Sequence, residues 1–165
     1  MAYVDYEYYH SLYDDRALPE ADFKRLSWEA EREIDKATSG VDGVRKLKVA
    51  FPEDEDNADA VKRCVCALIE FLYQLEVAER NASHVGQYTE REDGSLQGKV
   101  VSSVSAGNET VSYAVGKTVD TAVGMAIKSI ENREKSIYQF IAGRLSGIND
   151  ANGIGLLYMG TYPRS

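Results

Sequence analysis

The stretch ADAVKRCVCALIEFLYQLEVAER, residues 58–80, carries the clearest long apolar pattern in the chain. Its apolar residues recur three and four positions apart, which is the spacing of one face of an α-helix. We therefore predict a central helix over residues 58–80, whose start is favoured by the acidic run before it and capped by Asp56 or Asn57. The predicted buried face comprises Val61, Cys64, Val65, Leu68, Phe71, Leu72, Leu75 and Ala78.

Helical spacing also marks the segments on both sides of this central helix. Tyr6, Tyr9 and Tyr13 predict a short amphipathic helix, and Pro19 is suited to the first position of the next one. A further helix is predicted from about residue 118 until just before Gly147. The apolar stripe of the helix that follows Pro19 comprises Phe23, Leu26, Ala30, Ile34 and Ala37.

A β-hairpin is predicted at residues 98–116, because two alternating segments flank the dipeptide Gly107-Asn108. Its small or polar tip is expected to contact a neighbouring molecule. Residues 47–51 alternate and predict a short extended piece, whereas the polar residues 81–98 predict a loop. The tip residues are Ala106, Gly107, Asn108 and Glu109.

The chain ends in an apolar segment between glycines, which predicts an extended arm over residues 148–165. Consecutive residues of an extended segment point to opposite sides, so one surface cannot bury them all. We therefore expect the arm to dock on another protein. The residues concerned are Leu156, Leu157, Tyr158 and Met159. The predicted class is mainly α: a small helical bundle, residues 1–147, with one β-hairpin and this arm.

Charge is distributed unevenly along the 165 residues. Residues 1–93 hold 22 acids and 12 bases, whereas residues 94–165 hold 5 acids and 7 bases, for a net charge of −8. Such an acidic surface repels nucleic-acid phosphates, and the densest basic cluster is RKLK at residues 45–48. The N-terminus lacks the pattern of a signal peptide, and no run of apolar residues is long enough to cross a membrane.

No pattern of residues predicts an enzyme, a cofactor site or a metal site. His10 and His84 have no neighbouring ligands at metal-binding spacing, and an enzyme would need a cleft built around one of them. Cys64 and Cys66 do not face each other on a helix, so we expect two buried thiols rather than a disulfide.

Three stretches, taken in order, resemble the head–tail connector (adaptor) proteins of tailed bacteriophages and prophages. Tyr9 and Tyr13, followed by LPEADFKRLSWEAEREIDKAT at residues 18–38, are similar to the opening signature of that family. The Ser/Val-rich hairpin that ends in SYAV and the segment GIGLLYMG, residues 153–160, are similar to its later motifs. Asp14-Asp15, Ile154 and Met159 depart from the family pattern, in which glycines, Thr and Arg are usual.

This resemblance implies a non-enzymatic structural subunit without a cofactor, made in the bacterial host cytoplasm and placed in the virion neck. Connectors form a homo-oligomeric ring, commonly a dodecamer, with the portal protein above, a tail-completion or stopper protein below, and DNA passing through without specific binding. We expect acids to line the lumen of the ring. The candidate lumen acids are Glu53, Asp54, Glu55, Asp56, Glu90, Glu92 and Asp93.

The alternative function is that of a small DNA-packaging or regulatory protein. Such a protein would bind nucleic acid through residues 45–48.

Overall fold

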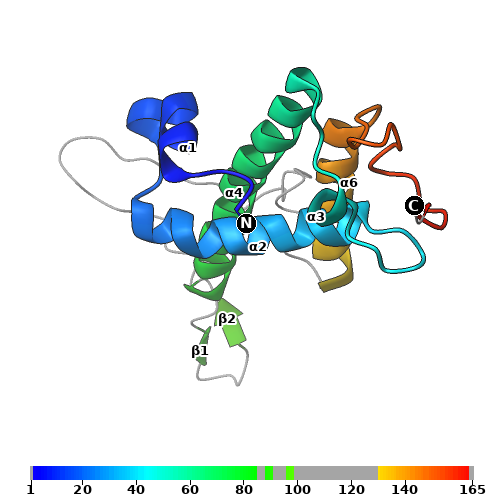
Figure 1. The fold of residues 1–165 in the computed structure, drawn as a ribbon. Coiled ribbons are helices and arrows are strands. Elements are labelled where there is room, and N and C mark those ends of the chain that lie inside the picture. The colour runs from blue at the N-terminus through cyan, green and yellow to red at the C-terminus, as the bar shows by residue number, and fades with distance from the viewer. Residues whose placement is uncertain (1, 85–87, 91–95, 99–129, 164–165) are drawn as a thin grey trace.

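The computed structural model describes residues 2–84, 88–90, 96–98 and 130–163. It is mainly helical, as the sequence predicts. The long helix α4 (Glu55–His84) is crossed by α2 (Glu20–Thr38), and α6 (Ile130–Leu145) packs against both of them (Figure 1). The short helix α1 (Tyr6–Tyr13) packs on α2 near its start. The bundle is therefore organised around α4.

Helix α4 confirms the predicted central helix and extends beyond it at both ends. The cap is Asp54 rather than Asp56 or Asn57: its carboxylate accepts a hydrogen bond of 3.0 Å from the amide of Asn57. The helix therefore starts about one turn earlier than predicted. Glu53 and Asp54 lie before the helix, and Glu55 and Asp56 lie in its first turn. The fully or almost fully buried apolar residues of α4 are Val61, Cys64, Val65, Cys66, Leu68, Ile69, Phe71, Leu72 and Leu75.

Helices α2 and α6 supply the apolar surface that covers α4. The predicted stripe of α2 is confirmed, since all five of its members are buried. In α6, Ile137, Ile141 and Leu145 are buried, and the ring of Phe140 stacks on that of Phe71 with centroids 4.7 Å apart. At about 25 cal/mol per Å² of buried apolar surface, this packing supplies the main stabilisation of the fold.

Helix α1 attaches to the bundle through aromatic rings. Tyr9 is fully buried, and its ring lies 5.0 Å from that of Phe23 in α2. Its hydroxyl donates to the Glu70 carboxylate in α4 and accepts a hydrogen bond of 3.0 Å from the amide of Leu18. One tyrosine thus joins α1, α2 and α4, with the 3₁₀ turn η1 (Asp14–Arg16) connecting the first two.

Two local predictions are wrong. Residues predicted to be extended instead form the helical turn α3 (Lys46–Val49), because Leu47 and Ala50, three positions apart, are both buried whereas Val49 is exposed. The predicted loop at residues 81–98 contains the end of α4 and two short antiparallel strands, β1 (Tyr88–Glu90) and β2 (Leu96–Gly98). Strands this short and polar carry no periodic apolar signal, so only backbone pairing reveals them.

The hairpin predicted at residues 98–116 lies outside the described residues, apart from Gly98 at the end of β2. The same holds for the start of the last predicted helix, residues 118–129. The described part of that helix ends at Leu145, before Gly147, as predicted.

The two thiols of α4 generate the first testable prediction. Cys64 and Cys66 are buried and free, and burial raises the pKa of each thiol to about 12. Because the thiolate is the reactive form, neither should react with Ellman's reagent at pH 8 while the protein is folded. Both should react once urea unfolds the chain. Rapid reaction of either thiol in the native protein would contradict this packing.

Candidate interaction surface

The C-terminal segment is held by a lysine that is inaccessible to solvent. Lys46, in α3, has 0% of its surface exposed. Its ammonium donates hydrogen bonds to the backbone carbonyls of Gly155 and Leu156, at 3.2 and 3.0 Å, and to that of Tyr158. Burial lowers the pKa of this ammonium, while the carboxylates of Asp150 and Asp42 act in the opposite direction. Backbone carbonyls thus replace the water that the charge has lost.

A second set of hydrogen bonds closes the segment on itself. The hydroxyl of Tyr162 donates to the Asp150 carboxylate at 2.6 Å and accepts from the side-chain amide of Asn152 at 2.8 Å. The other oxygen of Asp150 accepts from the backbone amides of Asn152 and Ile154, at 2.9 and 2.8 Å. Burial and the bond to Asp150 raise the pKa of Tyr162. The turn at residues 150–154 is therefore built around one buried carboxylate.

The end of α2 meets the C-terminal segment at two glycines. A Cβ atom added to Gly40 would lie 2.6 Å from the carbonyl oxygen of Gly160. Beside this contact, the amide of Val41 donates to the carbonyl of Met159 at 3.2 Å. Asp42 adds a third link, because its carboxylate accepts from the amide of Tyr162 at 2.9 Å. The backbones approach this closely only because Gly40 has no side chain.

These contacts contradict the prediction that the C-terminal segment is an extended arm that does not pack on its own bundle. Leu156 is completely buried in the core of its own chain, and Leu157 packs half-buried against that core. The segment is folded rather than extended, with a bridge between Asn149 and Gly155. A folded segment can bury Leu156 on one side because its backbone polar groups are paired within the chain, by Lys46 among others.

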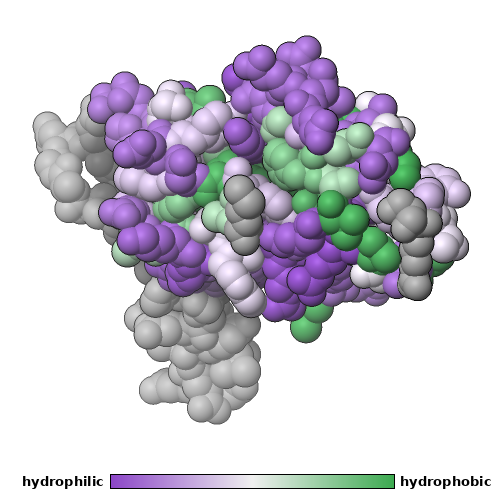
Figure 2. Space-filling model, viewed as in Figure 1, coloured by the Kyte–Doolittle hydropathy of each residue, from purple (hydrophilic) through white to green (hydrophobic). Residues whose placement is uncertain are grey.

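Part of the predicted docking segment does face solvent. Tyr158 and Met159 are 55% and 50% exposed, and the neighbouring Val41 is 75% exposed. We call these three residues the C-terminal patch. On the face shown in Figure 2, hydrophilic residues predominate and apolar residues gather over α3 and the segment that leads to α4. The C-terminal patch is therefore one of a few exposed apolar surfaces in the described part of the chain.

The candidate lumen acids, the hairpin tip and the two histidines do not belong to the C-terminal patch. The acids at residues 53–56 are exposed around the start of α4, where Asp54 is engaged as the cap. Glu90 lies in β1, whereas Glu92, Asp93 and the hairpin tip, residues 106–109, lie outside the described residues. His10 is exposed on α1, and His84 is the last residue of α4.

The basic cluster at residues 45–48 is largely engaged within the chain. Lys46 is buried, and the Lys48 ammonium lies 3.9 Å from the Asp35 carboxylate and 4.1 Å from the centre of the Tyr3 ring. Arg45 alone of the three bases is exposed without an ion pair to a described carboxylate. The role of Lys46 was missed from sequence, because lysine is among the residues least often buried and nothing local marks this one.

Comparison with known proteins identifies no relative: no family model, no curated protein and no solved structure matches the chain. In the described part of the chain, no helix is both long and apolar enough to cross a membrane. No group of three or more His, Cys, Asp or Glu side chains among the described residues could hold a metal ion. The surface features above are therefore the basis for a functional proposal.

Replacing Lys46 with methionine tests the role of the buried ammonium. Lys46→Met keeps the side-chain length but removes the donor to the carbonyls of Leu156 and Tyr158, so the free energy of unfolding should fall by about 1–3 kcal/mol. Limited proteolysis should cut residues 150–163 faster than in the wild type. The control is Lys24→Met, which removes an exposed ion pair with Glu20 and should change stability by less than about 0.5 kcal/mol. Equal stability of the two variants would contradict the assignment.

The glycine contact makes a separate prediction. Gly40→Ala forces a backbone shift at Gly160 and should lower the free energy of unfolding by about 1–3 kcal/mol. The matched control is Gly143→Ala in α6, where an added Cβ would meet nothing within 4 Å; better helix propensity should make it about 0.5–1 kcal/mol more stable than the wild type. Urea unfolding of both variants measures the difference. A Gly40→Ala variant as stable as Gly143→Ala would show that the contact is not tight.

Proposed function

We propose that the chain is a head–tail connector subunit of a tailed bacteriophage or prophage. In this proposal, copies form a ring below the portal, above a tail-completion or stopper protein, and DNA passes through the ring without specific binding. The protein has a structural role, with no catalytic activity and no cofactor, in the virion neck. Heterologous contacts that close by rotation are how one type of subunit makes such a conduit.

The observation that carries this proposal is that separate stretches resembling connectors lie together in space. Residues 18–38 and 153–160 are more than a hundred positions apart, yet Gly40, two residues after the end of α2, lies against Gly160, and the amide of Val41 donates to the carbonyl of Met159. At the other end of α2, Phe23 packs on Tyr9 of the tyrosine-rich helix. The hairpin stretch lies outside the described residues, so it is the proximity of the other two stretches that supports a shared architecture.

Two exposed features fit the role of a ring subunit. The C-terminal patch offers exposed apolar side chains to a portal protein or to an adjacent copy, and Lys46 binds the backbone carbonyl of Tyr158 on the buried side of the patch. The exposed acids at residues 53–56 are suited to a lumen wall that repels DNA phosphates. The hairpin tip, residues 106–109, remains a proposed contact with a neighbouring molecule.

The proposal is tested by mixing the purified protein with portal particles and imaging them by electron microscopy. We expect rings on the portal with the wild type, and none with Met159→Glu, since a buried carboxylate in the interface would be unpaired. The matched control is Ile130→Glu, which adds the same charge at a residue that is 82% exposed on α6. This control should still form rings.

Three results would contradict the proposal. The first is the absence of any binding of the wild type to portal particles. The second is a closed two-fold dimer in mature particles, which cannot form a conduit. The third is a specific electrophoretic shift of DNA at physiological salt, which would favour the alternative of a nucleic-acid-binding protein.

A further inference from the structure

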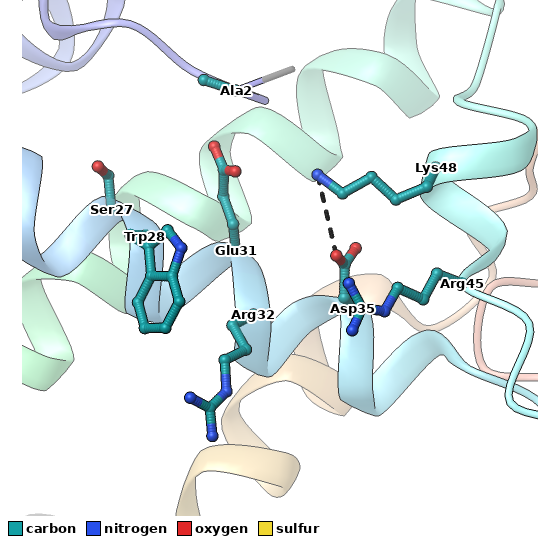
Figure 3. Close-up of a pocket in the computed structure, with 8 residues that line it drawn as sticks. All are labelled: Ala2, Ser27, Trp28, Glu31, Arg32, Asp35, Arg45 and Lys48. Atoms are coloured by element: carbon teal, nitrogen blue, oxygen red, sulfur yellow. Dashed lines mark ion pairs between the residues drawn. The ribbon is translucent and has the colours of Figure 1, made fainter.

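A groove opens between the N-terminal segment, α2 and α3, away from the C-terminal patch. Its volume is about 530 Å³. Figure 3 shows Trp28 and Arg32 projecting from α2, with Arg45 and Lys48 on the side formed by α3 and the residue before it. Six side chains decide its chemistry: Trp28, Glu31, Arg32, Asp35, Arg45 and Lys48.

The indole at this groove is exposed to an unusual degree. Trp28 has 65% of its surface accessible, although tryptophan has a large apolar surface to bury. The guanidinium carbon of Arg32 lies 5.5 Å from the centre of the indole ring. An exposed tryptophan and two exposed arginines line the same groove. Tryptophan and arginine are among the residue types that contribute most to the binding energy of protein interfaces.

The two acids in the groove are already engaged within the chain. A Glu31 carboxylate oxygen accepts a hydrogen bond of 2.7 Å from the amide of Tyr3. Asp35 accepts one of 2.5 Å from the hydroxyl of Tyr3 and is paired with Lys48 at 3.9 Å. Neither acid forms an ion pair with Arg32 or Arg45. These hydrogen bonds occupy carboxylate oxygens without cancelling their charge, so the two acids and three bases of the groove leave it a net charge of +1. Neither arginine forms an ion pair with a described carboxylate.

The other bases of α2 show how unusual this is. Lys24 pairs with Glu20, Arg25 with Glu76, and Lys36 with Glu134. Arg32 forms no such pair with a described carboxylate, and neither does Arg45 across the groove. In a chain with 27 acids and 19 bases, two exposed guanidinium groups that form no ion pair with a described carboxylate lie in the same groove as the one tryptophan. The groove is therefore a locally positive site on a chain whose net charge is −8.

We propose that this groove docks a short acidic segment of another protein. Carboxylates of the segment bind Arg32 and Arg45, whose planar guanidinium groups match a carboxylate with two parallel hydrogen bonds. An apolar side chain next to the carboxylate on Arg32, on the side away from Arg45, packs on Trp28. The inference does not depend on the connector function, because it rests only on the charge and shape of the groove.

A peptide fits this charge pattern better than a nucleic acid does. A single strand carries one phosphate at every nucleotide and would meet Glu31 and Asp35 as well as the acidic surface around the groove. A peptide can place carboxylates at two points only and leave the rest of the segment neutral. The net charge of −8 opposes the first ligand more strongly than the second.

The test uses the fluorescence of Trp28, which is the only tryptophan in the chain. The full-length protein is titrated with the peptide Glu-Glu-Leu-Glu-Glu and with its glutamine counterpart Gln-Gln-Leu-Gln-Gln. We expect the acidic peptide alone to shift the emission to shorter wavelength, because the leucine excludes water from the indole. The affinity should fall as salt is raised from 50 to about 500 mM.

Variants assign the interaction to the two arginines. Arg32→Gln and Arg45→Gln should each weaken peptide binding about tenfold, which is the loss of one charge-assisted contact. The matched control Lys24→Gln removes an exposed base from the same helix and should bind as the wild type does. Circular dichroism of all three checks that the helices are intact, which we expect because these side chains are outside the core.

Four results would overturn the proposal. They are no emission shift with the acidic peptide up to 1 mM, an equal shift with the glutamine peptide, tighter binding of a thymidine oligonucleotide, and a shift that depends only on the concentration of the protein itself. The last would indicate that a second copy occupies the groove. Because no portal particle takes part, the outcome is independent of the ring experiment.

Discussion

The C-terminal segment depends on one buried charge. The Lys46 ammonium is removed from water and solvated instead by backbone carbonyls of residues 155–158. Taking a cation out of water is costly unless polar groups replace its hydration, so the position of these carbonyls is tightly constrained. In turn, Lys46 donates to backbone carbonyls of the segment that would otherwise accept hydrogen bonds from water. Each partner thus needs the other.

This constraint explains why some apolar side chains of the C-terminal segment are buried while others are exposed. With the backbone held by Lys46, Leu156 is directed into the core while Tyr158 and Met159 face solvent. The close approach of Gly40 to Gly160 then ties the segment to the end of α2. Because hydrogen bonds within the chain already hold the backbone of the patch, a partner that binds it does not have to order an extended arm, which would be a cost of binding.

Charges play two different roles on this molecule. Most bases of α2 pair with carboxylates on the surface, where such pairs contribute little to stability. Arg32 and Arg45, beside Trp28, have no such carboxylate among the described residues and lie in a groove. Apolar burial around α4 accounts for the fold, and we propose that these two guanidinium groups serve recognition of an acidic segment. Stability and binding are thereby assigned to separate parts of the surface.

The sequence by itself determined α1, α2, α4 and the described part of α6, although not the turn α3. A stripe such as Phe23, Leu26 and Ile34 repeats at the period of the helix, and recognising it needs no knowledge of the partner helix. Only the tertiary structure decided the course of residues 150–163, since their hydrogen bonds join positions more than a hundred residues apart. The same is true of Lys46, whose burial depends on carbonyls brought to it by folding. The spacing of apolar residues shows which face of a helix is buried, because it is a property of neighbouring residues. Hydrogen bonds between residues far apart in the chain leave no such pattern in the local sequence.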